Sequence, residues 1–108
     1  MQFLDLVELR PYFAVKHHIP GRLRLKFNLS VLSRPEAQKI IERGDRLPAG
    51  IDKLRINKYA RSMILEYDNK IIDFDLLQKL LDADNDEEGK ALLSRIEKNI
   101  EQGEKNAN

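Results

Sequence analysis

The sequence predicts an α+β fold in which helices cover one face of a mainly antiparallel sheet. Two observations lead to this expectation. Apolar side chains alternate with polar ones over short extended stretches, and between and after these stretches they recur at helical spacing. The chain of 108 residues is also the size of one domain. We therefore expect one compact core with peripheral additions.

The first extended stretch runs from Tyr12 to Phe27. Pro20 has no N–H to donate to a strand ladder and Gly21 favours a bulge, so we expect one strand that bends at these two residues. Beyond the bend the two faces separate cleanly. Arg22, Arg24 and Lys26 fall on one face, and Leu23, Leu25 and Phe27 on the other.

Residues 33–43 predict a helix. Ser33 and Glu36 have the spacing of a capping box, and Pro35 is tolerated in the first turn. Residues 50–69 then predict a β-hairpin, because apolar residues alternate on both sides of the sequence NKYAR. This connection contains no Asn-Gly turn, so we expect a loop of more than two residues.

A second helix is predicted over residues 72–84, with Asp73 as its N-cap and with Ile72 and Leu77 at hydrophobic-staple positions. A weaker helix follows over 89–102. Its apolar residues form one face that we expect to be exposed and suited to self-association or helix exchange. These residues are Leu92, Leu93, Ile96 and Ile100.

The order strand, helix, hairpin, helix forms most of a ferredoxin-like βαββαβ unit, followed here by an extra helix. No strand follows the second helix. Either the N-terminal segment fills that edge of the sheet, or the C-terminal helix covers it or exchanges across it. The predicted division is an N-terminal segment at 1–11, a ferredoxin-like domain at 12–83, an acidic link and amphipathic helix at 84–102, and a disordered tail at 103–108.

Composition excludes several classes of protein. The chain has no cysteine, which removes disulfide frameworks, thiolate metal sites and cysteine nucleophiles. The opening MQFLDLVELR lacks the basic start and the apolar run of a signal peptide. No apolar stretch approaches the roughly 20 residues that span a bilayer. We expect a cytoplasmic location, with any membrane contact made through a partner.

Two motifs resemble a known family, the cysteine-free branch of the heavy-metal-associated domains. HIPGRLRLKF, which contains Pro20 and Gly21, resembles the H-x-x-P-G-R-x-R-L-R opening of that branch. GIDKLRINKYARSMILEYD is similar to its G-V-x-x-V-x-V-N-x-x-T-G-S-x-L-V-x-Y-D segment, and the resemblance covers roughly residues 12–83. The hairpin positions that match are Gly50, Asn57, Ser62, Leu65, Tyr67 and Asp68.

This resemblance implies a ferredoxin-like fold and an association with metal transport. Such domains occur at the N-terminus of heavy-metal P-type ATPases and as small stand-alone partners of them, and some related proteins belong to iron-storage compartments. Ala60 and Arg61 stand where the family usually has Thr-Gly, so we expect a different hairpin turn. The CxxC site of the better-known branch is absent, and copper-chaperone chemistry is therefore not implied.

The basic residues of neighbouring strands are expected to share one sheet face. Residues 1–65 hold 13 Lys and Arg against 6 Asp and Glu, whereas residues 66–108 hold 6 against 12. Such a face suits an acidic partner. The resemblance implies that this partner is a metal-transporting membrane ATPase or a metal-storage compartment protein, and another copy of the chain is a further candidate. A solvated face, or one covered by the acidic C-terminal segment, is the alternative. The residues are Arg22, Arg24, Lys26, Lys53 and Arg55.

His17 and His18 are the two histidines of the chain. Adjacent strand residues point to opposite faces, so these two rings cannot easily share one ion. A bulge or a symmetric dimer would be needed to make His18 a ligand, with further ligands from Asp52, Glu66 or Asp68. His18 is therefore either a structural hydrogen-bonding residue or the ligand of a direct carrier of iron, zinc or haem.

Other functions have weaker support in the sequence. The outward strand positions carry no aromatic residue for stacking RNA bases. The stretch from Asp82 to Gly89 begins like a calcium loop but has Glu87 at position six and Leu93 at position twelve. There is no phosphate-binding loop or nucleophile grouping. We predict a non-enzymatic accessory module of metal homeostasis, linked to iron.

Overall fold

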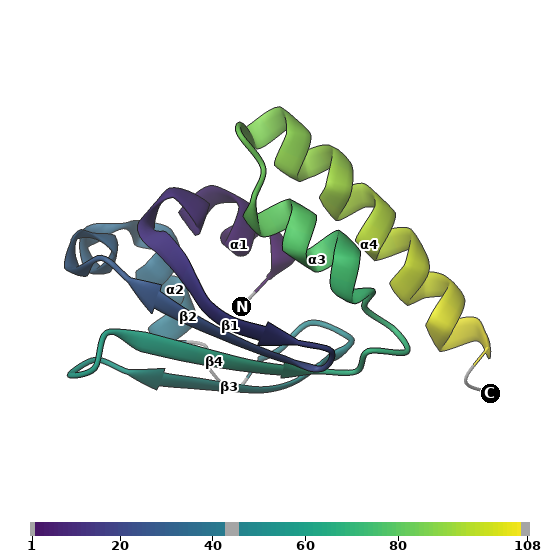
Figure 1. The fold of residues 1–108 in the computed structure, drawn as a ribbon, viewed down its shortest axis with the longest axis horizontal. Helices are drawn as coiled ribbons and strands as arrows, with labels where there is room; N and C mark the ends of the chain where they lie inside the picture. Colours follow the sequence, from purple (N-terminus) through teal and green to yellow (C-terminus); the bar gives the residue numbers. More distant parts are fainter. Residues whose placement is uncertain (1, 43–45, 107–108) are drawn as a thin grey trace.

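The computed structural model describes residues 2–42 and 46–106 and shows one sheet with its helices gathered on one side (Figure 1). The described elements, in order, are α1 (Phe3–Leu9), a 3-10 turn η1 (Arg10–Tyr12), β1 (Phe13–Ile19), β2 (Arg22–Phe27), a 3-10 turn η2 (Leu29–Ser33), α2 (Pro35–Glu42), β3 (Ile51–Asn57), β4 (Ser62–Tyr67), α3 (Phe74–Leu81) and α4 (Asp86–Asn106).

The sheet has the strand order β1-β2-β4-β3, and all neighbouring strands are antiparallel. The α+β, ferredoxin-like prediction is confirmed, with β2, α2, β3, β4 and α3 as its core units. The edge strand that was missing from the sequence reading precedes this core instead of following it. β1 fills the position beside β2 that the last strand of a βαββαβ unit would take.

Two predictions about the N-terminal part are wrong. Residues Phe3–Leu9 form a helix and not an edge strand. Pro20 and Gly21 form a tight turn between two strands and not a bend within one. Gly21 has φ +89, a conformation that glycine adopts without a steric penalty. The chain therefore reverses at this point, and the two histidines lie on β1 while the three cations that follow lie on β2.

The core lies between the sheet and the helices. α4 packs on α3 and α1, and its Leu93, Ile96 and Ile100 are buried while Leu92 is partly buried. The expected exposed face of this helix is therefore part of the core of its own chain. The sequence pattern predicts this hydrophobic stripe correctly, but it does not reveal the N-terminal helix that the stripe contacts. α4 also continues to Asn106, beyond the residue at which a disordered tail was expected; residues 107–108 lie outside the described residues.

Several local predictions are confirmed. The side chain of Asp73 accepts a hydrogen bond from the N–H of Leu76 at 3.0 Å and so caps α3. The hairpin loop spans residues 58–61, longer than two residues. The capping box at Ser33 is wrong, because this hydroxyl donates to the carbonyl of Ser30 at 2.8 Å in the preceding 3-10 turn.

Candidate functional site

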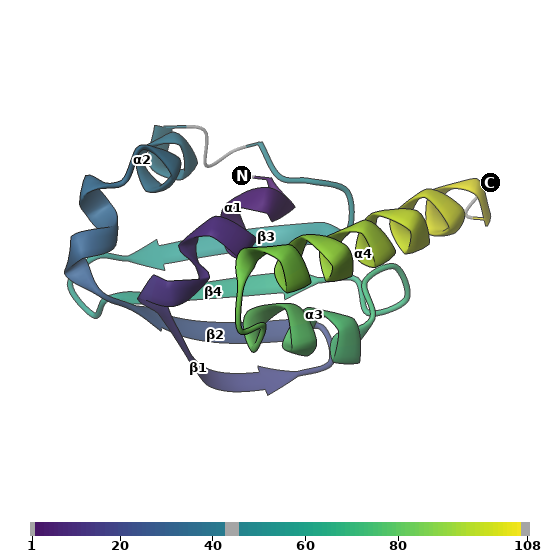
Figure 2. The same ribbon diagram turned by 90° about the horizontal axis from the view of Figure 1, so that it is seen from above.

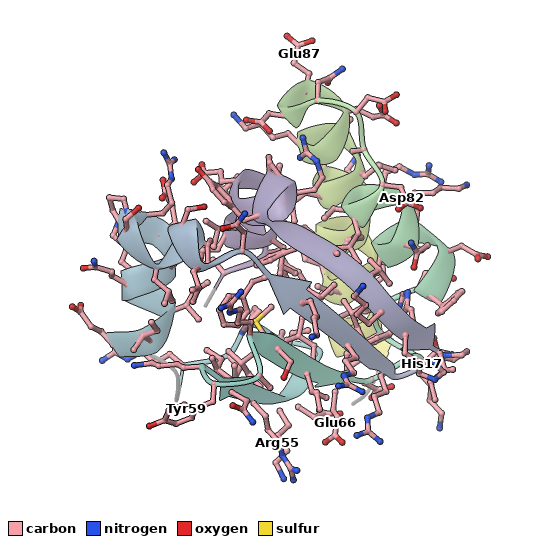
Figure 3. All side chains as sticks on the ribbon, turned by 60° about the vertical axis from the view of Figure 1, so that its left-hand side comes forward. His17, Arg55, Tyr59, Glu66, Asp82 and Glu87 are labelled. Carbon is pink, nitrogen blue, oxygen red and sulfur yellow. The ribbon has the colours of Figure 1, made fainter. Side chains whose placement is uncertain are left out.

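The sheet face turned away from the helices carries the predicted basic residues. In Figure 3 the side chains of Arg55 and Glu66 project from this side of the sheet. The alternation of exposed and buried residues along β2 places its three cations here. We call this surface the open sheet face. By register it comprises Ala14, His17, Ile19, Arg22, Arg24, Lys26, Lys53, Arg55, Asn57, Ser62, Ile64 and Glu66.

One row across the open sheet face has opposite charges side by side. Glu66 of β4 lies opposite Arg22 of β2 and opposite Lys53 of β3. It is the one carboxylate among the residues of this face. Cross-strand neighbours of opposite charge stabilise a sheet modestly, so this row is partly balanced within the molecule.

The central row has no such balance. Ile64 of β4 lies between Arg24 of β2 and Arg55 of β3, and His17 of β1 lies opposite Arg24. Strands in a sheet are about 4.8 Å apart, so the two arginines start roughly 10 Å from each other across an apolar side chain. Guanidinium groups bind carboxylates and phosphates in a bidentate manner. The row therefore offers two strong anion-binding groups around a hydrophobic centre.

The five cations of the open sheet face have no ion-pair partner among the described residues. The ion pairs found there join Arg10 to Asp86 at 3.2 Å and Arg34 to Glu36 at 3.3 Å, and neither involves the sheet. The prediction that these cations share one exposed face is confirmed by the strand register and exposure. The alternative expectation, that the acidic C-terminal segment covers this face, is wrong, because α4 lies on the opposite side of the sheet (Figure 1).

The sequence reading missed one residue beside this face. Tyr59, in the β3–β4 loop, is fully exposed and borders an open hollow at the end of the sheet. The same hollow is lined by Arg55 and Lys58, with Ile64 at its side. The available signal in the sequence is an aromatic residue between Lys58 and Arg61 in the loop.

His18 lies on the inner side of β1, opposite Leu23, whereas His17 pairs with Arg24 on the open sheet face. The expectation that the two rings point to opposite faces is confirmed. The His18 ring packs against Phe74, with ring centroids 4.2 Å apart, and against Tyr67 at 5.9 Å. It thereby joins the edge strand to β4 and to α3.

Both ring nitrogens of His18 are engaged in hydrogen bonds. Nδ1 lies 2.7 Å from Oε1 of Gln78, and Nε2 lies 2.8 Å from the hydroxyl of Tyr67. The amide of Gln78 is oriented by its Nε2, which donates to Asp82 at 3.0 Å. His18 Nδ1 therefore donates to Gln78, and in the neutral ring Nε2 accepts from Tyr67. This arrangement leaves no free lone pair on the ring for a metal ion.

Tyr67 is the titratable group of this cluster with a clear shift. Burial raises the pKa of its hydroxyl above 10.0, a hydrogen bond from the Gly21 backbone opposes the rise, and the negative charge of Asp73 adds to it. The side chain is thus held protonated as a donor to His18. Within the described part of the chain, no group of three or more His, Asp or Glu side chains is placed to hold a metal ion.

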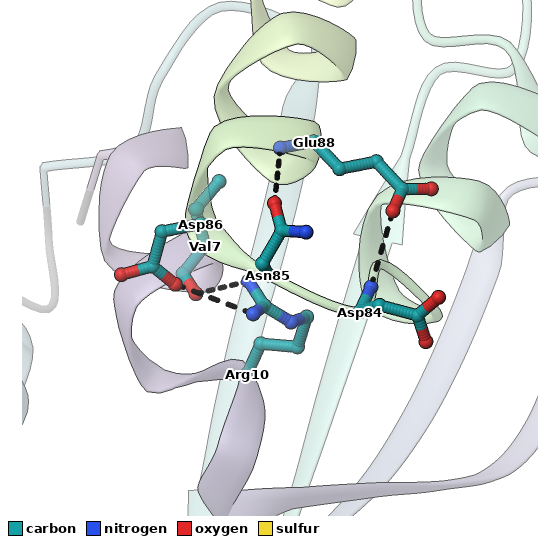
Figure 4. Close-up of polar contacts among 6 residues, drawn as sticks. All are labelled: Val7, Arg10, Asp84, Asn85, Asp86 and Glu88. Carbon is teal, nitrogen blue, oxygen red and sulfur yellow. Dashed lines mark hydrogen bonds and ion pairs between the residues drawn. The ribbon is translucent and has the colours of Figure 1, made fainter.

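Residues 84–88, which follow α3, cap the start of α4 and connect it to the N-terminal segment (Figure 4). Asn85 Oδ1 accepts from the N–H of Glu88 at 2.9 Å, and Glu88 Oε2 accepts from the N–H of Asp84 at 3.3 Å. Arg10 donates to the carbonyl of Val7 at 2.9 Å and pairs with Asp86. These contacts begin α4 and hold it against α1.

Comparisons with known proteins identify the family. None of the described helices has both the length and the apolar character needed to cross a bilayer. Searches of curated proteins and of solved structures give no match. A family model described as heavy metal associated domain 2 matches residues 5–108, nearly the whole chain. Membership of this family indicates a role in metal binding or transport. The resemblance carried by the two sequence motifs is thus confirmed, and the chain belongs to the heavy metal associated domain 2 family.

Proposed function

We propose that this chain is a non-enzymatic accessory module of metal transport or homeostasis, with iron as the metal, and that it acts in the cytoplasm by docking. The open sheet face is the docking surface, and the partner is a metal-transporting membrane ATPase or a metal-storage compartment protein with an acidic surface. The observation that supports this most strongly is the set of five unpaired cations against the single carboxylate of Glu66. The choice of iron and of these partners rests on the family resemblance.

The physical basis is desolvation of the central row by a partner. An exposed ion pair is worth only about 0.2–1 kcal/mol, but Arg24 and Arg55 flank Ile64, and a partner that covers Ile64 also excludes water from both guanidinium groups. Charge pairs then strengthen and fix the orientation of the complex. The formal net charge of the chain is only +1, so recognition depends on this face and not on overall charge.

Docking has more structural support than direct metal or haem carriage by His18. Ligation through either nitrogen of His18 would break a hydrogen bond of 2.7 or 2.8 Å, to Gln78 or Tyr67. His17 is exposed, but its nearest register partner is the cation Arg24, which disfavours a bound metal cation electrostatically. No contact of the described residues favours a carrier.

Site-specific photo-crosslinking in living cells tests the proposal. A photoreactive amino acid placed at Ile64 is expected to crosslink to a metal-transport or metal-storage protein, and the same group at the exposed Arg95 of α4 is the matched control. Charge reversal by Arg24→Glu and Arg55→Glu should abolish the Ile64 crosslink, whereas Lys90→Glu on α4 should not. A crosslink at Ile64 that survives both reversals, or one made equally from Arg95, would contradict docking through the open sheet face.

A further inference from the structure

The edge of β3 is a free strand edge. β3 lies at the end of the sheet order and pairs with β4 on one side only. In the described part of the chain, no backbone hydrogen bond joins residues 53–57 to another segment apart from β4. A strand edge of this kind presents unpaired N–H and C=O groups that accept an added strand.

An apolar groove runs beside this edge. Ile56 belongs to the inner side of β3, opposite Met63, and is nevertheless 36% exposed. The groove is lined by Ile40 and Ile41 of α2 together with Leu54, Ile56 and Lys58. Figure 2 shows β3 as the outermost strand on the side of α2.

The two sides of β3 define the chemistry of the occupant. An added strand places alternate side chains on the two sides of the sheet. On the inner side they would meet Leu54, Ile56 and the isoleucines of α2; on the outer side they would meet Lys53 and Arg55, which have no ion-pair partner among the described residues. We propose that the edge of β3 binds an extended segment of a partner protein in which apolar and acidic residues alternate.

This inference rests on the proposed docking function, because Lys53 and Arg55 belong to both surfaces, and it names the form of the partner segment. It is a case of strand addition, in which main-chain hydrogen bonds supply affinity and alternate side chains supply specificity. The groove selects apolar side chains of the added segment, and Lys53 and Arg55 select acidic ones.

A second copy of the chain is a poorer occupant. Antiparallel pairing of two β3 strands centred on Leu54 places Lys53 of one copy opposite Arg55 of the other, and pairing centred on Arg55 places the two arginines opposite each other. Like charges directly opposite one another destabilise a strand pair. The charges therefore favour a different, acidic segment over self-pairing.

β1, the strand at the other edge of the sheet, is an internal control for strand addition. The pairing of β1 shifts register between Val15 and His17, and a bulge in an edge strand disrupts regular pairing with an added strand. The irregularity of β3 lies between Ile51 and Lys53, so residues 53–57 remain regular. Strand addition is expected at β3 and not at β1.

Three synthetic peptides added to the isotope-labelled full chain test the inference by NMR. The first alternates Glu and Val, the second has the same composition in scrambled order, and the third alternates Lys and Val. The Glu-Val peptide should shift the amide signals of residues 53–57 and bind about tenfold more tightly than the scrambled peptide. Arg55→Glu should weaken the Glu-Val peptide and strengthen the Lys-Val peptide, each by about tenfold.

A fourth peptide separates strand addition from binding by charge alone. It is the Glu-Val peptide with N-methyl groups on alternate residues, which removes the hydrogen bonds to the strand edge, and it should lose binding. Equal binding of this peptide would overturn the inference, as would shifts centred on Arg24 and Ile64, although the latter would leave docking through the open sheet face intact. Concentration-dependent shifts of residues 53–57 without peptide would overturn it in favour of self-pairing.

Discussion

At the scale of single residues, Arg61 carries backbone strain. Among the described residues, Arg61 is the non-glycine residue with a positive φ, at +54. The family motif that the hairpin resembles has glycine at this position. A non-glycine residue in the left-handed region destabilises the folded state by roughly 1–2 kcal/mol. Glycine avoids this penalty, but its larger backbone entropy in the unfolded state offsets about 0.5–1 kcal/mol of the gain. We therefore expect Arg61→Gly to raise the free energy of unfolding by about 0.5–1 kcal/mol.

Guanidinium denaturation of the purified protein measures this change. Lys58→Gly in the same loop is the matched control and should be neutral or destabilising, because Lys58 does not have a positive φ. If Arg61→Gly is less stable than the wild type, the left-handed conformation is not what limits the stability of this turn.

His18 is expected to be a structural residue. Replacement by Ala removes its hydrogen bonds to Gln78 and Tyr67 and should lower the free energy of unfolding by about 1–2 kcal/mol, because the site is partly buried. His17→Ala, on the open sheet face, should change it by less than about 0.5 kcal/mol. Calorimetric titration with ferrous iron, zinc and haem should give the same result for the wild type and His18→Ala. Ligand binding that is lost in His18→Ala would support the carrier alternative.

Tyr67 gives the fold a dependence on alkaline pH. Its folded pKa is raised, mainly by burial, above an unfolded value of about 10. The folded state then holds the proton more tightly, so this contribution is fully present below about pH 10 and is lost as pH rises through the folded pKa. Tyr67→Phe should be less stable at neutral pH, because the bond to His18 is lost. Its free energy of unfolding should also fall less steeply than that of the wild type above about pH 10.

Near-ultraviolet absorbance of tyrosinate provides the independent check. The chain has three tyrosines, and Tyr59 is fully exposed, which makes it the matched control. The late-ionising component should disappear in Tyr67→Phe and persist in Tyr59→Phe. A late component that remains in Tyr67→Phe would assign the raised pKa to another residue.

At the scale of secondary-structure elements, α4 packs tightly against the N-terminal segment at Gly89. A Cβ atom on Gly89 would lie 2.9 Å from Cγ1 of Val7 and 3.2 Å from Nη1 of Arg10. Gly to Ala in an exposed helix gains about 1 kcal/mol, but overpacking a core contact costs about 1–3 kcal/mol. Val7 is fully buried and has little room to move, so we expect Gly89→Ala to lower the free energy of unfolding.

Ser94→Ala is the control for helix propensity, because Ser94 is an exposed residue of the same helix. It should be neutral or slightly stabilising in the same denaturation experiment. Stabilisation by both substitutions would show that α1 and α4 separate easily at this joint.

The sequence predicts correctly those structural features that depend on a local pattern of residues. Alternation in residues 22–27 predicted which side chains of β2 face outward, and this placed the cations of the open sheet face correctly. The N-cap at Asp73 was likewise a local signal. The pattern of Phe3–Leu9 does not distinguish a strand from a helix, because its apolar residues fit both. The segment forms a helix that packs on α4, a contact that is not visible in the local sequence.

Long-range contacts account for what the sequence did not reveal. The partners of His18 lie 49 and 60 residues away, and no spacing rule connects them. The free edge of β3 likewise depends on the order of the strands in the sheet, which is set by long-range pairing of β2 with β1 and β4. The apolar groove depends further on the packing of α2 beside β3, which brings Ile40 and Ile41 near Leu54 and Ile56.

At the scale of the whole molecule, α4 is part of the core of its own chain, and we expect it to be required for folding. Its Leu93, Ile96 and Ile100 are at most 8% exposed and belong to the same core cluster as α1 and α3. Burying a large aliphatic side chain contributes about 1.5–3 kcal/mol, so these three together contribute about 5–9 kcal/mol. That is comparable to the whole stability of a small domain, about 5–15 kcal/mol.

Truncation after Asn85 should therefore yield a chain without a cooperative thermal transition in circular dichroism and with poorly dispersed amide signals. Truncation after Gln102 keeps all three core residues of α4 and should keep the fold, with only a small loss of stability. A folded monomer from the shorter chain would show that the sheet, α2 and α3 form an independent core. In that case α4 would be free to exchange between copies, and the self-association predicted from its apolar stripe would regain a structural basis. Because Leu76, Leu77 and Leu80 of α3 are buried in the cluster that α4 shares, we expect the shorter chain to expose them and to aggregate instead.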